Sequence, residues 1–218
     1  MSLSLHEAFK VHILDVQNPL QNYIFLLEDV RTHDVVVIDP THAELVLDYC
    51  QQHSLNIKHI WITHHHQDHT AGIADLVAQY AVPVYAPQDE LSKIPCATHG
   101  LSHEQVIDFN DIQIEIIATA GHTLGHICYF IDALDTLFSG DTLFVMGCGR
   151  VIEGTHQQMY HSLNRLAALP ARTVVYCSHE YSLNNAQFAL HIEPDNLAVQ
   201  QRLADIQQLR EQNLPTVP

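Results

Sequence analysis

Residues 63–69 read Thr-His-His-His-Gln-Asp-His, and this heptad decides how the whole sequence is interpreted. It directly follows an apolar run that is expected to be a buried strand. In an extended segment His64, His66 and Asp68 would point to one side. His69 would then turn in at the start of the next helix. Because zinc, iron and manganese accept imidazole and carboxylate ligands, the heptad predicts parts of two metal sites.

The alternative interpretation of the heptad is a solvated histidine-rich loop or an expression tag. A tag would be terminal and monotonous. This run is internal, and it carries Asp68 at a defined place between a predicted strand and a predicted helix. The position and the composition therefore favour metal binding.

Length and composition limit the class of protein. The chain has 218 residues, of which 47% are hydrophobic, enough for one substantial domain plus a small appendage. No segment approaches the roughly 18 apolar residues of a membrane span, and the N-terminus lacks the pattern of a secretory signal. The five cysteines form no C-x-x-C pair, which favours a reducing compartment, and we expect the cytoplasm.

The charge balance is strongly acidic, with 25 Asp and Glu against 9 Lys and Arg. Binding to nucleic acid or to an anionic membrane needs a basic face, so both classes of partner are disfavoured. Of the 18 histidines, most are expected at the surface and a few as metal ligands. The sequence leaves the oligomeric state open.

Strand and helix patterns alternate along the chain. Strands are expected over residues 9–15, 21–28, 34–38, 57–63, 82–86, 105–109, 112–118, 126–131, 136–139 and 172–177. Helices are expected over residues 41–52, 70–80 and 155–169, and the pattern is helical from Leu183 to the end. Residues 87–103 are expected to be irregular.

Three further polar constellations stand at the ends of predicted strands. They are Gly121-His122-Thr123, Ser139-Gly140-Asp141-Thr142 and Ser178-His179-Glu180. Each alone is more often a turn or a surface histidine, but open α/β architectures place their chemistry at such strand ends. Together with the heptad they offer seven ligands, the number that a two-metal site needs.

These constellations resemble the metallo-β-lactamase superfamily. Two shorter motifs are similar to glyoxalase II, the hydroxyacylglutathione hydrolase family: Gly147-Cys148-Gly149-Arg150 followed by Glu153-Gly154-Thr155, and His179-Glu180-Tyr181 followed by Asn184-Asn185. The resemblance runs from Lys10 to Ala189. It implies an α/β fold, an αββα sandwich with the metals at one edge of the two sheets. Residues 1–180 would form the catalytic domain, and residues 181–218 a short helical C-terminal segment.

The resemblance assigns metal ligands residue by residue: His64, His66 and His122 to the first metal, Asp68, His69 and His179 to the second, and Asp141 to both. It implies two divalent ions, with zinc as the first choice and iron or manganese as the others. Two adjacent cations lower the pKa of a shared water, and the resulting hydroxide would attack a thioester carbonyl. Asp68 or Asp141 would orient that hydroxide or receive its proton.

The implied substrate is a glutathione thioester, S-D-lactoylglutathione, in methylglyoxal detoxification. Arg150 is the only basic residue within these motifs, and the resemblance implies that Arg150 and Tyr181 contact the tripeptide. The family often has an aromatic residue where this chain has Ile152. It also usually carries a basic pair in a C-terminal region beyond the point where this sequence stops, at Pro218. Either the protein is shortened relative to the family, or glutathione is held more weakly or differently.

Two residues near these motifs receive a structural interpretation. His126 lies four residues after His122 and is expected to be structural, with support of a metal ligand as the alternative. Cys148 lies between two glycines and is expected to pack where little room exists, not to act as a nucleophile.

Four alternatives remain. A persulfide dioxygenase of the same superfamily shares the Gly-Cys-Gly-Arg motif, but it would use one iron held by two histidines and one aspartate. A lactonase or β-lactamase is less favoured, and the acidic charge disfavours a nuclease. A non-catalytic metal-binding module would lack at least one ligand, and none is missing here.

Overall fold

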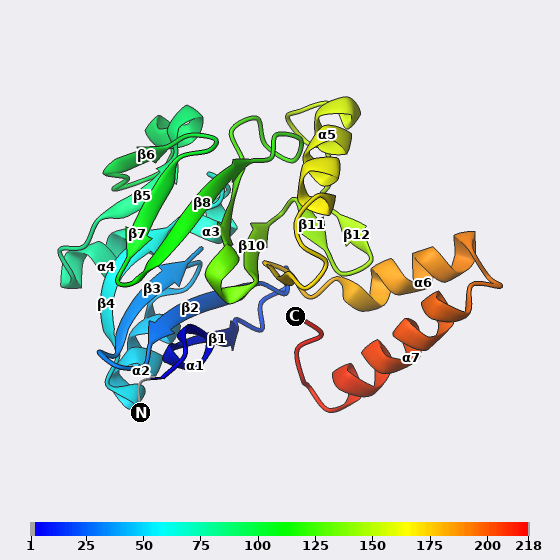
Figure 1. Cartoon of the computed structure of the whole chain (residues 1–218), viewed down its shortest axis with the longest axis horizontal. Helices are drawn as coiled ribbons and strands as arrows, with labels where there is room; N and C mark the ends of the chain where they lie inside the picture. Colours follow the sequence, from blue (N-terminus) through cyan, green and yellow to red (C-terminus); the bar gives the residue numbers. More distant parts are fainter. Residues whose placement is uncertain (1–2, 218) are drawn as a thin grey trace.

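Two β-sheets packed face to face form the centre of the computed structural model, which describes residues 3–217 (Figure 1). The first sheet has the order β1-β2-β3-β4-β5-β6, with strands Phe9–Asp15, Tyr23–Asp29, Asp34–Ile38, Asn56–Trp61, Val84–Pro87 and His99–Leu101. The second has the order β13-β10-β9-β8-β7, with strands Val174–Cys177, Thr136–Gly140, Ile127–Ile131, Ile112–Ala118 and Val106–Phe109. A small hairpin pairs β11 (Leu143–Phe144) with β12 (Gly147–Cys148).

The strand β2 shows why the sheets stack. All of its residues are buried, and alternate side chains point to opposite faces. Phe25 and Leu27 face the core between the sheets, whereas Ile24 and Leu26 face the outer side of the first sheet. Burial on both faces explains the continuous apolar run of residues 23–27, because only a strand covered on both sides has no polar face.

Helices cover the outer face of each sheet. On the first sheet, α2 (Ala43–His53) and α4 (Ile73–Gln79) bury Val46, Ile73 and Leu76 against the strands. On the second, α5 (His156–Ala167) buries Leu166. A short helix α1 (Leu5–Ala8) precedes β1. The layers run helix, sheet, sheet, helix, so the expected αββα sandwich is confirmed.

Two further helices form an arm beside the sandwich. In Figure 1, α6 (Ser182–Ile192) and α7 (Leu197–Glu211) project from it as a pair, and the chain then returns to the body. Val217 is buried in the core between the sheets, and Thr216 is buried beside Glu180. The continuous helical pattern expected after Leu183 is therefore broken, and Asn196 caps the second helix by accepting hydrogen bonds from two backbone N–H groups.

Several local expectations were wrong. The helix expected over residues 70–80 is two helices, α3 (Gln67–Thr70) and α4, separated at Gly72. A Cβ on Gly72 would lie 2.6 Å from the carbonyl oxygen of Pro40, so the chain turns where only glycine fits. The stretch 87–103, expected to be irregular, contains a 3-10 helix (Gln88–Lys93) and strand β6. The hairpin of β11 and β12 was not anticipated.

None of the helices described between residues 3 and 217 has both the length and the apolar character that a membrane crossing requires.

Candidate metal centre

The ends of four segments meet at one edge of the two sheets. The heptad follows β4, and His122 lies in the connection between β8 and β9. Asp141 directly follows β10, and His179 lies two residues beyond the end of β13. The candidate residues thus come from both sheets and converge where the strands stop.

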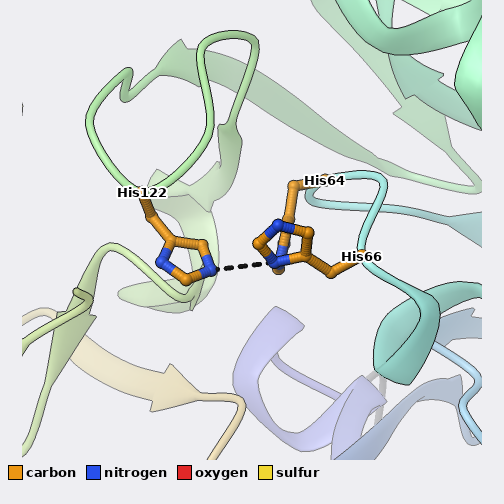
Figure 2. A group of neighbouring side chains, drawn as sticks. All are labelled: His64, His66 and His122. Atoms are coloured by element: carbon orange, nitrogen blue, oxygen red, sulfur yellow. Dashed lines mark hydrogen bonds between the residues drawn. The ribbon is translucent and has the colours of Figure 1, made fainter. Parts of the chain in front are cut away.

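Three histidines form the first cluster. The Nδ1 atom of His66 lies 3.1 Å from Nε2 of His64 and 3.0 Å from Nε2 of His122. Figure 2 shows the three rings turned toward a common point, with the contact between His66 and His122 dashed. Three nitrogens at this spacing can coordinate one ion at metal–nitrogen distances of about 2 Å and so supply three of the four ligands of a tetrahedral site.

Asp68, His69 and His179 form the second cluster. The Oδ2 atom of Asp68 lies 3.4 Å from Nε2 of His69 and 3.5 Å from Nε2 of His179. Asp68 and His69 both lie in α3, so the expectation that Asp68 continues an extended segment was wrong. The first turn of this short helix brings its carboxylate back toward the edge.

Asp141 lies between the two clusters and turns one oxygen to each. Its Oδ2 is 3.3 Å from Nε2 of His122. Its Oδ1 is 3.2 Å from Nε2 of His179 and 3.5 Å from Nε2 of His69. This is the arrangement of a carboxylate that can bridge two ions.

The far nitrogens of the histidines are held by the scaffold. His122 Nδ1–H donates to the carbonyl of Arg150 at 2.7 Å, and His179 Nδ1–H donates to the carbonyl of Leu20 at 2.8 Å. Because a carbonyl can only accept, these bonds fix the tautomer in which Nε2 carries a lone pair toward the centre.

Asp39 is the most connected support, and the sequence interpretation missed it. It accepts hydrogen bonds from the backbone N–H of Thr63 at 2.8 Å and from its hydroxyl at 2.7 Å. It also accepts from Nδ1–H of His69 at 3.0 Å. Its only signal in the sequence is its place directly after β3, at the end of a strand that was expected over residues 34–38.

Unpartnered buried atoms show that the cluster fits a cation. Among residues 3–217, Nε2 of His69 and Oδ1 of Asp141 are buried without a hydrogen-bond partner. These two atoms lie 3.5 Å apart. Burial lowers the pKa of His69, but the carboxylates of Asp141 and Asp39 outweigh it and hold this pKa well above its ordinary value, so the pair attracts positive charge. Buried polar atoms are rarely left unsatisfied, and a positive ion between them supplies the missing partner.

Burial and charge set the protonation states. Deep burial, reinforced by the neighbouring histidines, holds the pKa of His64 well below its ordinary value. Burial raises the pKa of Asp141, but the charges of the neighbouring histidines, first of all that of His69, outweigh this and leave it at about 2. A neutral imidazole and an ionised carboxylate are the forms that bind a metal.

Two buried side chains that are not predicted metal ligands, Glu90 and His126, hold the loops that carry the ligands. Glu90 accepts from the backbone N–H of His65 at 2.8 Å and from that of Gly125 at 2.9 Å, and so ties the heptad to the loop of His122. His126 accepts from the backbone N–H of Asp141 at 3.0 Å, and burial lowers its pKa to about 3. His126 therefore supports a candidate metal ligand directly, which is the alternative that the sequence had left open.

A cavity of about 440 Å³ opens over the cluster. Arg150 and Tyr181 line it, and the ring of Tyr181 stacks on His179 with centroids 4.7 Å apart. Arg150 is exposed and has no carboxylate within ion-pairing distance in the described part of the chain. Cys148 also lines the cavity and is exposed, so the expectation that it packs in a confined space was wrong.

Known sequences share these features. Residues 18–179 match the family model described as metallo-beta-lactamase superfamily, and residues 180–218 match that described as hydroxyacylglutathione hydrolase C-terminus. Hydroxyacylglutathione hydrolase 2 of Vibrio vulnificus strain YJ016 is 46% identical over 198 residues, which cover 90% of this chain and 77% of that protein. This chain belongs to the hydroxyacylglutathione hydrolase family.

Two solved structures resemble this chain in fold. The ETHE1 protein of Myxococcus xanthus superposes with a TM-score of 0.70 at 30% identity, covering 79% of this chain and 76% of that one. TTHA1623, described in a di-iron-bound form, superposes with a TM-score of 0.67 at 28% identity, covering 77% and 91%. With the histidine and aspartate clusters, the family identifies the centre as a divalent-metal-binding site.

Proposed function

We propose that the protein is a dinuclear-metal thioester hydrolase that cleaves S-D-lactoylglutathione into glutathione and a 2-hydroxy acid. The observation that carries the proposal is Asp141, whose two oxygens face two separate ligand clusters. The relatives named hydroxyacylglutathione hydrolase support the substrate, and the di-iron form of TTHA1623 supports two ions. Zinc is the first choice, with iron or manganese as alternatives.

The proposed ligand roles follow the two clusters. His64, His66 and His122 hold one ion, Asp68, His69 and His179 hold the other, and Asp141 holds both. Such ions, when bound, supply a water of lowered pKa and polarise a carbonyl.

The chain's own groups orient the reactants. Asp68 and Asp141 carry carboxylate oxygens at the lining of the cavity, where they orient the attacking water or take up its proton. Hydrolysis breaks the bond between the carbonyl carbon and sulfur, and a thiol of pKa about 8.5 leaves readily as a thiolate.

Arg150 and Tyr181 are the proposed contacts of the glutathione moiety. Glutathione has two carboxylates, and Arg150 is the only basic residue that lines the cavity over the described chain. A guanidinium without an ion-pair partner can bind a carboxylate through two parallel hydrogen bonds. Arg150 therefore supplies the local cation in an otherwise acidic protein.

The persulfide dioxygenase alternative makes a different prediction about metal content. One iron would need two histidines and one aspartate, whereas here Asp68, His69 and His179 form a second convergent cluster beside the first. Metal analysis of the purified protein should therefore give about two ions per chain. One iron per chain, together with oxygen consumption, would instead favour the dioxygenase.

The proposed location is the cytoplasm. All five cysteines are free in the structure, as a reducing compartment requires.

The substrate is tested by comparing S-D-lactoylglutathione with a simple thioester that lacks the γ-glutamyl and glycyl arms. We expect a clear preference for the glutathione compound, and we expect Arg150→Ala to remove most of it by raising KM. Arg172→Ala is the matched control, because Arg172 is paired with Asp135 and Asp132 outside the cavity. Equal rates on both thioesters would contradict the glutathione assignment and leave the hydrolase assignment standing.

A further inference from the structure

A second, open hollow of about 330 Å³ adjoins the metal cavity. It is lined by Leu20, Thr41, Gln67, Asp68 and Ala71, and it shares Leu20 and Asp68 with the cavity. We propose that this hollow, here called the acyl hollow, receives the side chain of the substrate's acyl group and sets the acyl selectivity of the enzyme. The inference rests on the proposed thioester hydrolase function.

The chemistry of the acyl hollow suits an apolar group. Leu20, with 47% of its surface exposed, and the exposed methyl of Ala71 form its apolar part. None of the five lining residues is basic, and Asp68 is the single acidic one. A carboxylate of glutathione would find no basic side chain among these lining residues, whereas an aliphatic or aromatic acyl side chain would be removed from water.

The lining of the two hollows gives the direction of the substrate. Arg150 and Tyr181 line the metal cavity and not the acyl hollow, whereas Leu20 and Asp68 line both. A thioester carbonyl carries sulfur on one side and the acyl substituent on the other. If the glutathione arm fills the metal cavity beside Arg150 and Tyr181, the acyl substituent can extend past Leu20 and Asp68 into the acyl hollow.

The wall of the acyl hollow is fixed before substrate arrives. The amide of Asn22 donates to the carbonyl of Asp68 at 3.2 Å and to its Oδ2 at 3.0 Å. The side-chain oxygen of Asn18 in turn accepts from the backbone N–H of Asn22 at 3.1 Å. The loop that carries Leu20 is thus attached to the metal centre at both His179 and Asp68, and a preorganised wall discriminates by size better than a mobile one.

The test is to fill the acyl hollow and compare two acyl groups on the same thiol. Ala71 is exposed at the end of α3, so Ala71→Phe adds a ring to the hollow without entering the core. We measure kcat/KM for S-mandeloylglutathione, which has a phenyl side chain, and for S-lactoylglutathione, which has a methyl. The ratio of mandeloyl to lactoyl kcat/KM should fall by about tenfold in Ala71→Phe. Gln67→Trp, a second filling variant at an exposed position, should lower it in the same direction.

Ala78→Phe is the matched control. Ala78 is exposed on α4 and lines neither hollow, so the same substitution should leave the ratio unchanged. Metal content and Tm are measured for every variant.

The outcomes separate the two proposals. If the wild-type protein cleaves neither thioester, the proposed function fails. If it cleaves the lactoyl compound but not the mandeloyl compound, the proposed role of the acyl hollow is contradicted and the hydrolase function stands. The same conclusion follows if the ratio in Ala71→Phe stays within roughly twofold of the wild-type ratio.

Discussion

At the scale of single residues, Asp141 links the two halves of the centre. It is the one candidate ligand whose two oxygens face different clusters, and its backbone N–H is held by His126. Asp39 has a comparable role behind the centre, because it receives hydrogen bonds from Thr63 and His69 at once. Replacing a residue that holds a ligand in this way typically lowers metal affinity by about 10- to 100-fold.

Replacement of Asp141 should affect both metals, and replacement of Asp68 only one. We expect Asp141→Ala to lower metal content from about two ions per chain to below one and to reduce kcat by about a thousandfold. Asp68→Ala should retain about one ion, because the histidines of the first cluster are untouched. Elemental analysis after dialysis measures both. Asp75→Ala, at an exposed position, is the control, and equal metal loss in the two variants would contradict the bridging role.

At the scale of the elements, the candidate ligands lie at the ends of strands, and the sequence predicted these positions. The heptad after β4, Asp141 after β10 and His179 after β13 were all located from apolar runs that end in polar motifs. Their convergence came from the resemblance to a known family, because strand order in a sheet cannot be read from local patterns.

The supporting groups could not be foreseen. Asp39 and Glu90 look like ordinary turn and helix residues until long-range folding brings them beside His69 and His65. Short elements such as β6, β11 and α3 were missed for the same reason, since their few residues are placed by tertiary contacts rather than by periodicity.

The turn after β10 depends on a residue that tolerates a left-handed conformation. Gly140 has φ +52°, and a Cβ there would lie 2.6 Å from Oγ1 of Thr63 and 2.7 Å from Nε2 of His126. We expect Gly140→Ala to lower the free energy of unfolding by about 2 kcal/mol or more and to reduce metal content, because Asp141 is displaced. Gly100→Ala is the control, since its Cβ would mainly meet the movable side chain of Gln88. Thermal unfolding with metal analysis measures the difference.

A buried pair of side chains, His12 of β1 and Glu28 of β2, makes the free energy of unfolding depend on pH. Burial lowers the pKa of His12. Burial raises the pKa of Glu28, but hydrogen bonds from His33 and His12 outweigh it and leave this pKa below its ordinary value. Both groups resist protonation in the folded state, so the stabilisation from each is present above its unfolded pKa. The contribution of His12 is lost as the pH falls below about 6.5, and that of Glu28 only as the pH falls below about 4.3.

Replacement of His12 should reduce this dependence. In His12→Gln the side chain stays neutral and can still donate to Glu28, which lies 2.6 Å from His12. Its Tm should therefore fall less than that of the wild type between pH 7 and pH 5. Parallel Tm curves for the two proteins would show that His12 does not cause the loss.

At the scale of the whole molecule, the helical arm is attached to the sandwich at both of its ends. Its first helix begins just after His179, and the segment after α7 brings Thr216 and Val217 back into the body (Figure 1). Glu180 accepts from the hydroxyl of Thr216 at 2.6 Å, from its backbone N–H at 2.8 Å and from the hydroxyl of Tyr23 at 2.7 Å. The residue next to a candidate ligand is thus coupled to the last described part of the chain.

Removal of the Thr216 hydroxyl should loosen this attachment. Thr216→Ala leaves a buried carboxylate with one donor fewer, at a cost of about 1–3 kcal/mol, or roughly 2–10 °C in Tm. We also expect faster cleavage by a protease in the connection between α6 and α7. Ser92→Ala, at an exposed position, is the control for both measurements. An unchanged Tm and an unchanged cleavage rate would show that the tail does not hold the arm.

The burial of Val217 between the sheets has a consequence for how the molecule could be divided. The connection between α6 and α7 lies at the far end of the arm, away from the sandwich (Figure 1). A break in the backbone there would leave α7 anchored through Val217, Thr216 and the contacts with α6. The protein is therefore a natural candidate for fragment complementation, in which two separately made polypeptides, joined by no covalent bond, reassemble into one folded enzyme.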